Sequence, residues 1–329
     1  MKAAILGAPG APLQLVDLAV PRPGPGEILI RLEASGICHT DVHVWQGHYR
    51  PANPPKPFIL GHEGVGRVAA LGPGVRDWAL GARAGAAWQH EACGSCPACK
   101  LGQEGFCQRQ RAHGYDVPGT FAEFVVAKAG FAARLPEGDA AALAPLMCAG
   151  LTALGALDRA GLQHGESCAV FGCGGLGQYA VQLARRRGAQ VHAVDTDPDK
   201  RALAMRHGAT STGAPQSDGP GQIADVVINF APTARAWPAM VHAVRPMGRI
   251  VAAAMVDEPV PLKQDWLTGS GVTLSGTSVG TRAQMRTLLA LHQADPLLAE
   301  IGRIGLQDAT MALTSLAEGR AKGRYCIIF

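Results

Sequence analysis

The amino-acid sequence predicts an α/β protein in which a doubly wound parallel sheet is joined to a mainly β domain. The chain has 329 residues, which is more than one compact core usually holds. Residues 1–150 contain short apolar runs between clusters of Gly and Pro, whereas strand-length runs alternate with helical stretches after residue 150. We therefore expect two domains of different architecture.

The first part of the chain has the texture of irregular β structure. Turn clusters at residues 21–27 (PRPGPGE) and 53–57 (NPPKP) separate its apolar runs. The runs at residues 27–32, 63–71 and 120–127 are each short enough to be strands. This part is expected to be a mainly β domain.

The second part alternates between strand and helix patterns. The expected strands are residues 167–172, 190–195, 224–230, 248–255 and 271–280, and the expected helices are residues 175–189, 198–209 and 233–244. Such alternation predicts right-handed βαβ units in a parallel sheet. Two more helices, 281–293 and 308–318, precede a final strand at 324–329, and residues 211–222 are expected to be an exposed loop.

Composition excludes several classes of protein. Hydrophobic residues make up 47% and charged residues 17%, as in a soluble globular protein. The net charge of +4 comes without a long like-charge block, so no nucleic-acid partner is expected. The sequence has no apolar run of 18 residues and no signal-peptide pattern, so we expect a cytoplasmic protein that does not associate with membranes. In a reducing compartment, nine cysteines favour metal binding over disulfides.

A glycine motif lies between an expected strand and an expected helix. It comprises Gly172, Gly174, Gly175, Leu176 and Gly177. Glycines there permit a tight turn and the close approach of a pyrophosphate to the backbone at a helix N-terminus. Asp195 ends the next strand, where a carboxylate binds the adenosine ribose and repels a 2′-phosphate, so NAD is favoured over NADP. The alternative is that Asp195 caps the helix that starts near Pro198.

Four cysteines are concentrated in residues 92–107. They are Cys93, Cys96, Cys99 and Cys107, with the spacing CxxCxxCx7C. Four thiolates can fill the coordination of one zinc ion, which makes a closed, structural site. An iron–sulfur cluster is the alternative.

Three further residues could form a site of another kind. Cys38, His62 and Cys148 would leave the fourth position of a zinc ion open to water or substrate. Taken singly, each could equally be an ordinary core cysteine or a hydrogen-bonded histidine.

Several segments resemble those of the zinc-dependent medium-chain alcohol dehydrogenases, in the same order and roughly the same spacing. They are GICHTDVH, GHEGVGRVAALGPGV, ACGSCPACKLGQEGFC, CAGLTAL, GCGGLGQYAVQLA, VDTDPDK and SGTSVGTR. The chain is most similar to the bacterial and yeast type that oxidises small primary alcohols. The resemblance implies a GroES-like catalytic domain at residues 1–150 and 279–329, and an NAD-binding Rossmann domain at residues 151–278.

The same resemblance implies two zinc ions per chain, NAD as coenzyme and a small alcohol or aldehyde as substrate. Cys38, His62 and Cys148 match the catalytic zinc ligands, and the four clustered cysteines match the structural ligands. Thr40 matches the hydroxyl group that takes the proton of the alcohol, and His43 matches the solvent end of a relay through the nicotinamide ribose. Asp41 matches a carboxylate that orients His62, and Glu63 matches one near the zinc.

Other matched positions concern coenzyme, substrate and assembly. His39 and Arg324 match positions facing the pyrophosphate, and Leu176 and Thr152 match positions near the nicotinamide. Asp195 and Lys200 match the pair at the adenosine ribose. Tyr49 and Trp88 fall where aromatic residues narrow the substrate pocket. The family also implies a homodimer or homotetramer, with an edge strand at residues 271–279 in the subunit contact.

Some positions depart from the family pattern. Ala82 replaces an acidic residue, Gln178 replaces a frequent histidine, and Ala254 stands in place of a glycine near the nicotinamide. Two enzyme alternatives remain, an NADPH-dependent aldehyde reductase and a formaldehyde-specific dehydrogenase. A third alternative is a coenzyme-binding protein without turnover.

Overall fold

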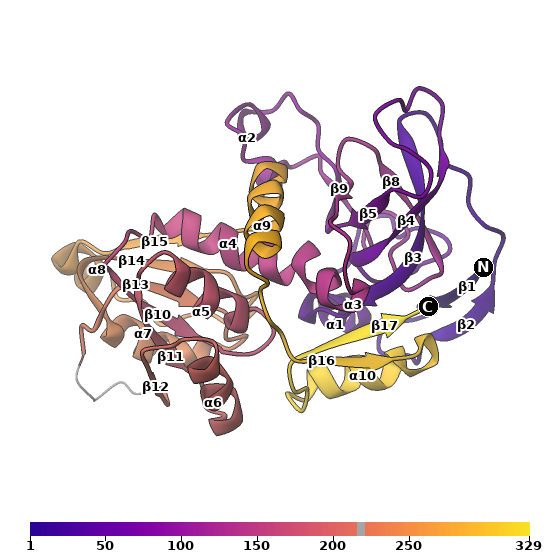
Figure 1. Ribbon diagram of the computed structural model, residues 1–329. Coiled ribbons are helices and arrows are strands. Elements are labelled where there is room, and N and C mark those ends of the chain that lie inside the picture. The colour runs from indigo at the N-terminus through magenta and orange to yellow at the C-terminus, as the bar shows by residue number, and fades with distance from the viewer. Residues whose placement is uncertain (216–220) are drawn as a thin grey trace. The chain divides into compact units, whose positions relative to one another are not determined.

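The computed structural model describes residues 1–215 and 221–329 and divides them into two compact units. Unit 1 comprises Met1–Ala149 and Thr281–Phe329, and unit 2 comprises Gly150–Gly280. Figure 1 shows both units along the chain, with the final segment in yellow among the indigo strands of unit 1. The chain therefore leaves unit 1 once and returns to it.

Unit 2 is built on a six-stranded sheet in which every strand pair is parallel. In spatial order the strands are β12 (Ser211–Gly213), β11 (Gln190–Val194), β10 (Ser167–Phe171), β13 (Ala224–Asn229), β14 (Val244–Ala252) and β15 (Thr273–Gly276). The order reverses between β10 and β13, which is the topological switch point where open α/β sheets bind ligands. All five residues of β10 are buried, because helices cover both faces of a parallel sheet.

One helix of unit 2 precedes its first strand, and the others alternate with the strands along the chain. They are α4 (Ala149–Ala160), which starts at the unit boundary, α5 (Gly177–Arg186), α6 (Pro198–Arg206), the short η3 (Ala234–Ala236), α7 (Trp237–Ala243) and α8 (Gln264–Ser270). One core cluster packs Phe171, Val227 and Ile250 of the sheet against Trp237 and Met240 of α7. This cluster forms the apolar interior between the sheet and the helices α7 and α8.

Unit 1 is organised around a long central strand, β3 (Glu27–Gly36). β3 pairs antiparallel with three strands: β4 (Glu63–Leu71), β8 (Phe124–Lys128) and β17 (Arg324–Ile328). The sheet continues to β5 (Arg83–Ala86) and β9 (Ala133–Arg134) on one side, and to β16 (Ile301–Ile304) on the other. Since β17 comes from the last residues, the C-terminal segment completes the sheet begun by the first hundred.

The remaining elements of unit 1 are short. Two small sheets consist of β1 (Lys2–Ile5) with β2 (Gln14–Asp17), and of β6 (Gln89–Glu91) with β7 (Arg111–Ala112). The helices are α1 (His39–Gln46), α2 (Pro97–Lys100), η1 (Glu104–Phe106), α3 (Ala140–Leu143), η2 (Ala144–Met147), α9 (Arg282–Ala294), η4 (Leu306–Asp308) and α10 (Ala309–Ala317). In Figure 1 the loop that carries α2 extends away from the strands of this unit.

The predicted fold class is confirmed, and the strand and helix order of the second part agrees with the sequence patterns. One prediction was wrong in part, because residues 211–213 form β12 and not a loop. β12 pairs with β11 through its backbone, and two of its three residues are exposed, so it carries no apolar pattern. Residues 216–220 of the predicted loop lie outside the described residues.

Within residues 1–215 and 221–329, no single helix has the length and apolar composition needed to cross a membrane. The bent pair Ala140–Met147 and Ala149–Ala160, with 42° between its halves, passes that test by length and composition only.

Candidate metal and coenzyme sites

Helix α1 carries four of the predicted site residues next to Cys38. Cys38 is the N-cap of the helix in an extended conformation, and Asp41 Oδ2 accepts a hydrogen bond from the Cys38 backbone N–H at 2.8 Å. This side chain therefore stabilises a helix start in the manner of a capping box. The helix ends at Gly47, whose φ of 77° lies in the left-handed region that glycine adopts readily.

Asp41 also connects α1 to the ligand candidate His62. Its Oδ1 lies 2.9 Å from His62 Nδ1 and accepts a hydrogen bond from the Gly61 N–H at 3.2 Å. Although burial lowers the pKa of His62, the Asp41 carboxylate raises it well above its usual value. Asp41 therefore both caps the helix and contacts His62, as expected for a carboxylate that orients this histidine, because its two oxygens bind different partners.

Cys38, His62 and Cys148 come together with Glu63 in one buried cluster. The candidate ligand atoms of these four residues all lie within 4.8 Å of one another. Cys38 Sγ and Cys148 Sγ are 3.9 Å apart. Two sulfurs bound to one zinc ion at about 2.3 Å in tetrahedral geometry would be separated by about 3.8 Å. The spacing of the two thiols therefore fits one zinc ion.

The histidine of this cluster supplies an independent test of fit. His62 Nε2 is buried and has no hydrogen-bond partner among the described residues. A buried polar atom without a partner is costly unless a ligand satisfies it. Because Asp41 holds Nδ1, Nε2 is the nitrogen that remains for a metal. The residues present therefore fit a zinc ion with two sulfur ligands and one nitrogen ligand.

Glu63 forms a buried ion pair with Arg324. Both carboxylate oxygens of Glu63 accept hydrogen bonds from Arg324 Nη2, and both side chains are almost fully buried. Burial raises the pKa of Glu63 to about 7, against the lowering effect of the Arg324 charge. Arg324 was predicted to face a pyrophosphate, and in the structure its partner is Glu63, on the strand that follows His62.

The predicted proton-transfer residues occupy one side of α1. Thr40 Oγ1 lies 3.8 Å from Cys38 Sγ, so a hydroxyl group stands directly beside the metal-ligand candidates. His43 follows three residues later, which puts it on the same face of the helix. The rings of His39 and His43 are 5.0 Å apart, and burial lowers the pKa of His39.

The two predicted substrate-pocket aromatics belong to a larger group. The Trp88 ring meets His62 edge-on at 5.1 Å between centroids. Tyr115, which the sequence did not single out, is 5.9 Å from Trp88 and stacks on Tyr49 at 4.9 Å. The only signal in the sequence was an aromatic residue within a segment rich in Gly and Pro, so its neighbours could not be foreseen.

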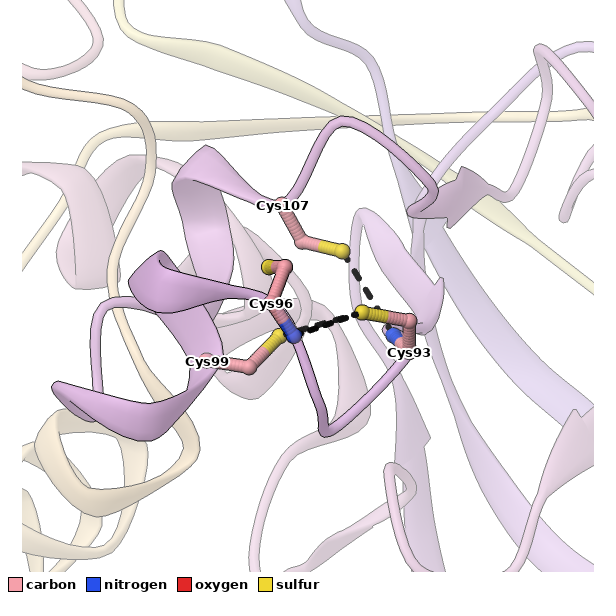
Figure 2. A group of neighbouring side chains, drawn as sticks. All are labelled: Cys93, Cys96, Cys99 and Cys107. Atoms are coloured by element: carbon pink, nitrogen blue, oxygen red, sulfur yellow. Dashed lines mark hydrogen bonds between the residues drawn. The ribbon is translucent and has the colours of Figure 1, made fainter.

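The second metal candidate is the cluster of Cys93, Cys96, Cys99 and Cys107 shown in Figure 2. Their sulfur atoms lie within 4.8 Å of one another, and Cys93 Sγ is 3.9 Å from Cys99 Sγ. The four side chains converge on one point between the loop at Cys93 and helix α2 (Figure 2). This separation also fits tetrahedral zinc at about 2.3 Å per Zn–S bond.

Backbone amides donate hydrogen bonds to two of the four sulfur atoms. Cys93 Sγ accepts a hydrogen bond from the Cys96 N–H at 3.3 Å, and Cys107 Sγ accepts one from the Cys93 N–H at 3.5 Å. Hydrogen bonds from the backbone of Ser95 and Cys96 lower the pKa of Cys93 to about 5. None of the nine cysteines forms a disulfide in the structure as described. The four thiols are therefore arranged as metal ligands.

The glycine motif forms the turn between β10 and α5. Gly172 has a φ of 86°, and a Cβ atom there would lie 2.7 Å from the Ala231 backbone nitrogen. Only glycine fits both requirements without strain. The turn leads directly into the N-terminus of α5, which is the arrangement that binds a pyrophosphate. Leu176 is the N-cap of α5, and Thr152 lies buried in α4.

Asp195 lies at the carboxyl end of β11, beside this turn. Its Oδ2 accepts a hydrogen bond from the Cys173 N–H at 2.8 Å, and its Oδ1 accepts one from the Asp197 N–H at 2.9 Å. Asp197 is the residue that caps α6, so the helix-cap alternative for Asp195 does not hold. Lys200 Nζ is 4.0 Å from Oδ2 of Asp197, the N-cap residue of α6.

Comparisons with known proteins agree with this architecture. Residues 24–137 match the family model described as alcohol dehydrogenase GroES-like domain, and residues 175–294 match the one described as zinc-binding dehydrogenase. An alcohol dehydrogenase of Moraxella sp. is 36% identical over 335 residues, covering 99% of both chains. The cobalt- and zinc-bound thermostable alcohol dehydrogenase of Pyrobaculum aerophilum is 30% identical, covers 100% of this chain and 99% of its own, and has a TM-score of 0.91.

A second solved structure bears on the coenzyme. The acetophenone reductase of Geotrichum candidum, in complex with NAD, is 27% identical, covers 100% of this chain and 97% of its own, and has a TM-score of 0.91. The predicted cofactors, zinc and NAD, are thus confirmed at the level of the family. The matched models, the full-length identity and the two thiol clusters together show that this chain belongs to the zinc-binding, GroES-like alcohol dehydrogenases of the medium-chain type.

Proposed function

We propose that this protein oxidises small primary alcohols to aldehydes with NAD, and catalyses the reverse reaction with NADH. The observation that carries the proposal is the buried Nε2 of His62, which has no hydrogen-bond partner in the described part of the chain and lies in the cluster that also contains Cys38 and Cys148. An open three-ligand zinc site has no function in a purely structural protein. This favours an enzyme over a coenzyme-binding protein without turnover.

The reaction moves a hydride and a proton in different directions. The carbon of the alcohol loses a hydride to the nicotinamide of NAD, and its hydroxyl group loses a proton, so an aldehyde, NADH and a proton are formed. A zinc ion held by Cys38, His62 and Cys148 would lower the pKa of the alcohol hydroxyl group, which eases the hydride loss. The protein must then carry the proton away from a buried site.

Thr40 and His43 are the residues proposed for that transfer. The Thr40 hydroxyl group can accept the proton of the alcohol and donate its own, and it lies beside Cys38 Sγ. His43, half-buried one helical turn later, would pass the proton to solvent, since histidine changes charge near neutral pH. Asp41 contributes by holding His62 in one orientation.

For the coenzyme, we propose that NAD binds at the turn between β10 and α5. Asp195 would bind the adenosine ribose hydroxyl groups with the remaining lone pairs of its carboxylate. The roles assigned from resemblance to His39, Thr152, Leu176, Lys200 and Arg324 remain predictions. The effect of Gln178 and Ala254, which depart from the family pattern, on the affinity for the coenzyme is also still a prediction.

Assembly and location also remain predictions. A homodimer or homotetramer is supported by the position of β15 at the end of the six-stranded sheet, where one edge has no strand partner among the described residues. A cytoplasmic location remains the expectation from cysteine usage.

The test is a substrate panel read by NADH absorbance, with zinc counted in the same preparations. Ethanol, butanol and benzyl alcohol should be oxidised with NAD, and two zinc ions should be found per chain. Cys148→Ala should bind one zinc ion and lose turnover by about a hundredfold or more. Cys168→Ala, which changes a buried cysteine of β10, is the matched control and should keep both.

Two results would overturn the proposal. One is Cys148→Ala turning over alcohols at the wild-type rate. The other is a wild-type enzyme that reduces aldehydes only with NADPH, which would favour the reductase alternative.

A further inference from the structure

Three aromatic side chains form a continuous row that starts at the metal-ligand candidate His62. Trp88 meets the His62 ring edge-on, at 5.1 Å and 87° between planes. Tyr115 is next to Trp88, at 5.9 Å and 37°, and Tyr49 is stacked on Tyr115, at 4.9 Å and 26°. We call Trp88, Tyr115 and Tyr49 the aromatic row. Tyr115 is its central member and contacts both of the others.

The three rings come from separate segments of the chain. Tyr49 follows α1, and its N–H donates a hydrogen bond to the His43 carbonyl oxygen at 3.2 Å. Trp88 lies between β5 and β6, and its carbonyl oxygen accepts a hydrogen bond from the His113 N–H at 2.9 Å. Tyr115 is therefore the ring that connects the segment after α1 with the segment beside His62.

The backbone before Tyr115 is fixed against the segment that carries His62. Gly114 has a φ of 71°, and a Cβ atom there would lie 2.7 Å from the Gly61 carbonyl oxygen and 2.8 Å from its nitrogen. This close approach needs a glycine, and it places Tyr115 at a set distance from the residue that precedes His62. The backbone that carries Tyr115 is thus positioned by close packing against Gly61, the residue before His62.

Geometry points to Tyr115 as a positioning residue that sets substrate selectivity, by holding Trp88 and Tyr49 in fixed orientations as one aromatic wall beside His62. This inference rests on the proposed alcohol oxidation. Tyr49 is 41% exposed, so its ring depends on stacking for a fixed orientation. Stacked aromatic rings prefer a defined geometry, and Tyr115 is stacked on Tyr49 while its ring lies tilted at 37° beside Trp88.

A wall of this kind distinguishes substrates by shape. A flat primary alcohol, of the benzylic or allylic class, can lie against aromatic rings with its hydroxyl group directed toward the metal ligands. A branched secondary alcohol projects a second substituent toward the wall. Removing the central ring would release Trp88 and Tyr49, which would weaken the fit of the flat substrate and admit the branched one.

The experiment compares benzyl alcohol with 2-butanol and ethanol, using the zinc-loaded enzyme and saturating NAD. In Tyr115→Ala, the ratio of kcat/KM for benzyl alcohol to that for 2-butanol should fall about tenfold or more, mainly through a higher KM for benzyl alcohol. Tyr115→Phe keeps the ring and should restore the ratio. Tyr115→Leu preserves apolar volume without a ring and should show the same fall in the ratio. It replaces Tyr115→Ala as the test variant if Tyr115→Ala folds poorly.

Phe131→Ala is the control for a general effect on unit 1, because Phe131 is a half-buried ring that contacts Arg282 and not the aromatic row. It should leave the ratio unchanged. An unchanged ratio in Tyr115→Ala and Tyr115→Leu, or an equal loss for all three alcohols, would overturn the inference and leave the alcohol oxidation standing. A wild-type enzyme without turnover of any alcohol would remove both.

Discussion

The carboxylate of Glu104 receives three hydrogen bonds from Arg282, a residue 178 positions later in the chain. Glu104 Oε1 accepts from the backbone N–H and Nε of Arg282 at 2.9 and 2.8 Å, and Oε2 accepts from Nη2 at 3.0 Å. Glu104 lies between the third and fourth clustered cysteines, and Arg282 is the first residue of α9. These hydrogen bonds connect the segment of the four clustered cysteines, Cys93 to Cys107, with the start of α9, where the chain returns to unit 1.

Glu104→Gln should lower the free energy of unfolding by about 1–2 kcal/mol, measured by urea unfolding near pH 7. Burial raises the pKa of Glu104, but the hydrogen bonds and charge of Arg282 outweigh it and hold the pKa below its usual value. The stabilisation is therefore present above the unfolded pKa of about 4.5 and is lost as the pH falls through the folded value. Glu318→Gln, in an exposed pair with Arg320, should have little effect. Equal effects of the two changes would contradict this prediction.

Cys99→Ser should remove one zinc ion and lower the melting temperature, because a structural zinc site contributes directly to folding energy. A loss of about 2 kcal/mol corresponds to about 4–8 °C in a unit of this size. Metal analysis and a thermal melt on the same sample are the measurements. A variant that lost the ion and melted at the wild-type temperature would show that the cluster does not stabilise the fold.

The buried pair His90 and His113 should make the protein sensitive to acid. Burial lowers the pKa of His90 to about 3 and that of His113 to about 4. Their nitrogens are 3.1 Å apart, and His113 Nδ1 is 2.7 Å from the Ala87 carbonyl oxygen, so a neutral pair satisfies its own hydrogen bonds. Below the unfolded pKa of 6.5 only the unfolded state takes up these two protons, so stability should fall with pH until about pH 4 to 3.

For two groups the slope is at most about 2.7 kcal/mol per pH unit. The double change His90→Asn and His113→Asn should be less stable at pH 7 but lose stability less steeply below pH 6.5, in urea unfolding at several pH values. His48→Asn, at an exposed histidine, should keep the wild-type slope. Identical slopes for the double variant and the wild type would refute the assignment.

His43→Gln should slow alcohol oxidation about tenfold or more at pH 7, and much less at pH 9, because hydroxide and small buffers can replace the imidazole as proton acceptor. The measurement is kcat against pH, with and without added imidazole. His48→Gln should follow the wild-type profile, since His48 is exposed and lies 6.2 Å from His43 between ring centroids. A His43 variant that responds to neither pH nor buffer would exclude the relay.

Asp195→Asn should reduce the preference for NAD over NADP about tenfold or more in kcat/KM. Asparagine keeps an oxygen for one of the two backbone N–H groups, of Cys173 or Asp197, and places its NH2 group against the other, so the change removes the negative charge together with one hydrogen bond of the turn. The lost charge no longer repels a 2′-phosphate. An unaltered ratio of the two coenzymes would mean that another group selects between them.

The cysteine cluster and the glycine turn could be predicted from sequence because both depend on local spacing. Cys93 to Cys107 span only two short helices, α2 and η1, with their connecting loops, so their separation along the chain already limits their separation in space. The six strands of unit 2 were foreseen except for β12, whose three residues have no apolar pattern. By contrast, Cys38 and Cys148 are 110 residues apart and were paired through family resemblance, not spacing.

The sequence by itself determined the types of metal ligand, five of the six strands of unit 2 and the glycine turn that we propose for the coenzyme, because periodicity and short motifs act over a few residues. Only the tertiary structure decided that Tyr115 stands between Trp88 and Tyr49, and that Glu104 binds Arg282. Such contacts join segments far apart in the chain and arise from the packing of whole sheets and loops. No local pattern encodes them, because each is fixed by the sum of many weak contacts elsewhere.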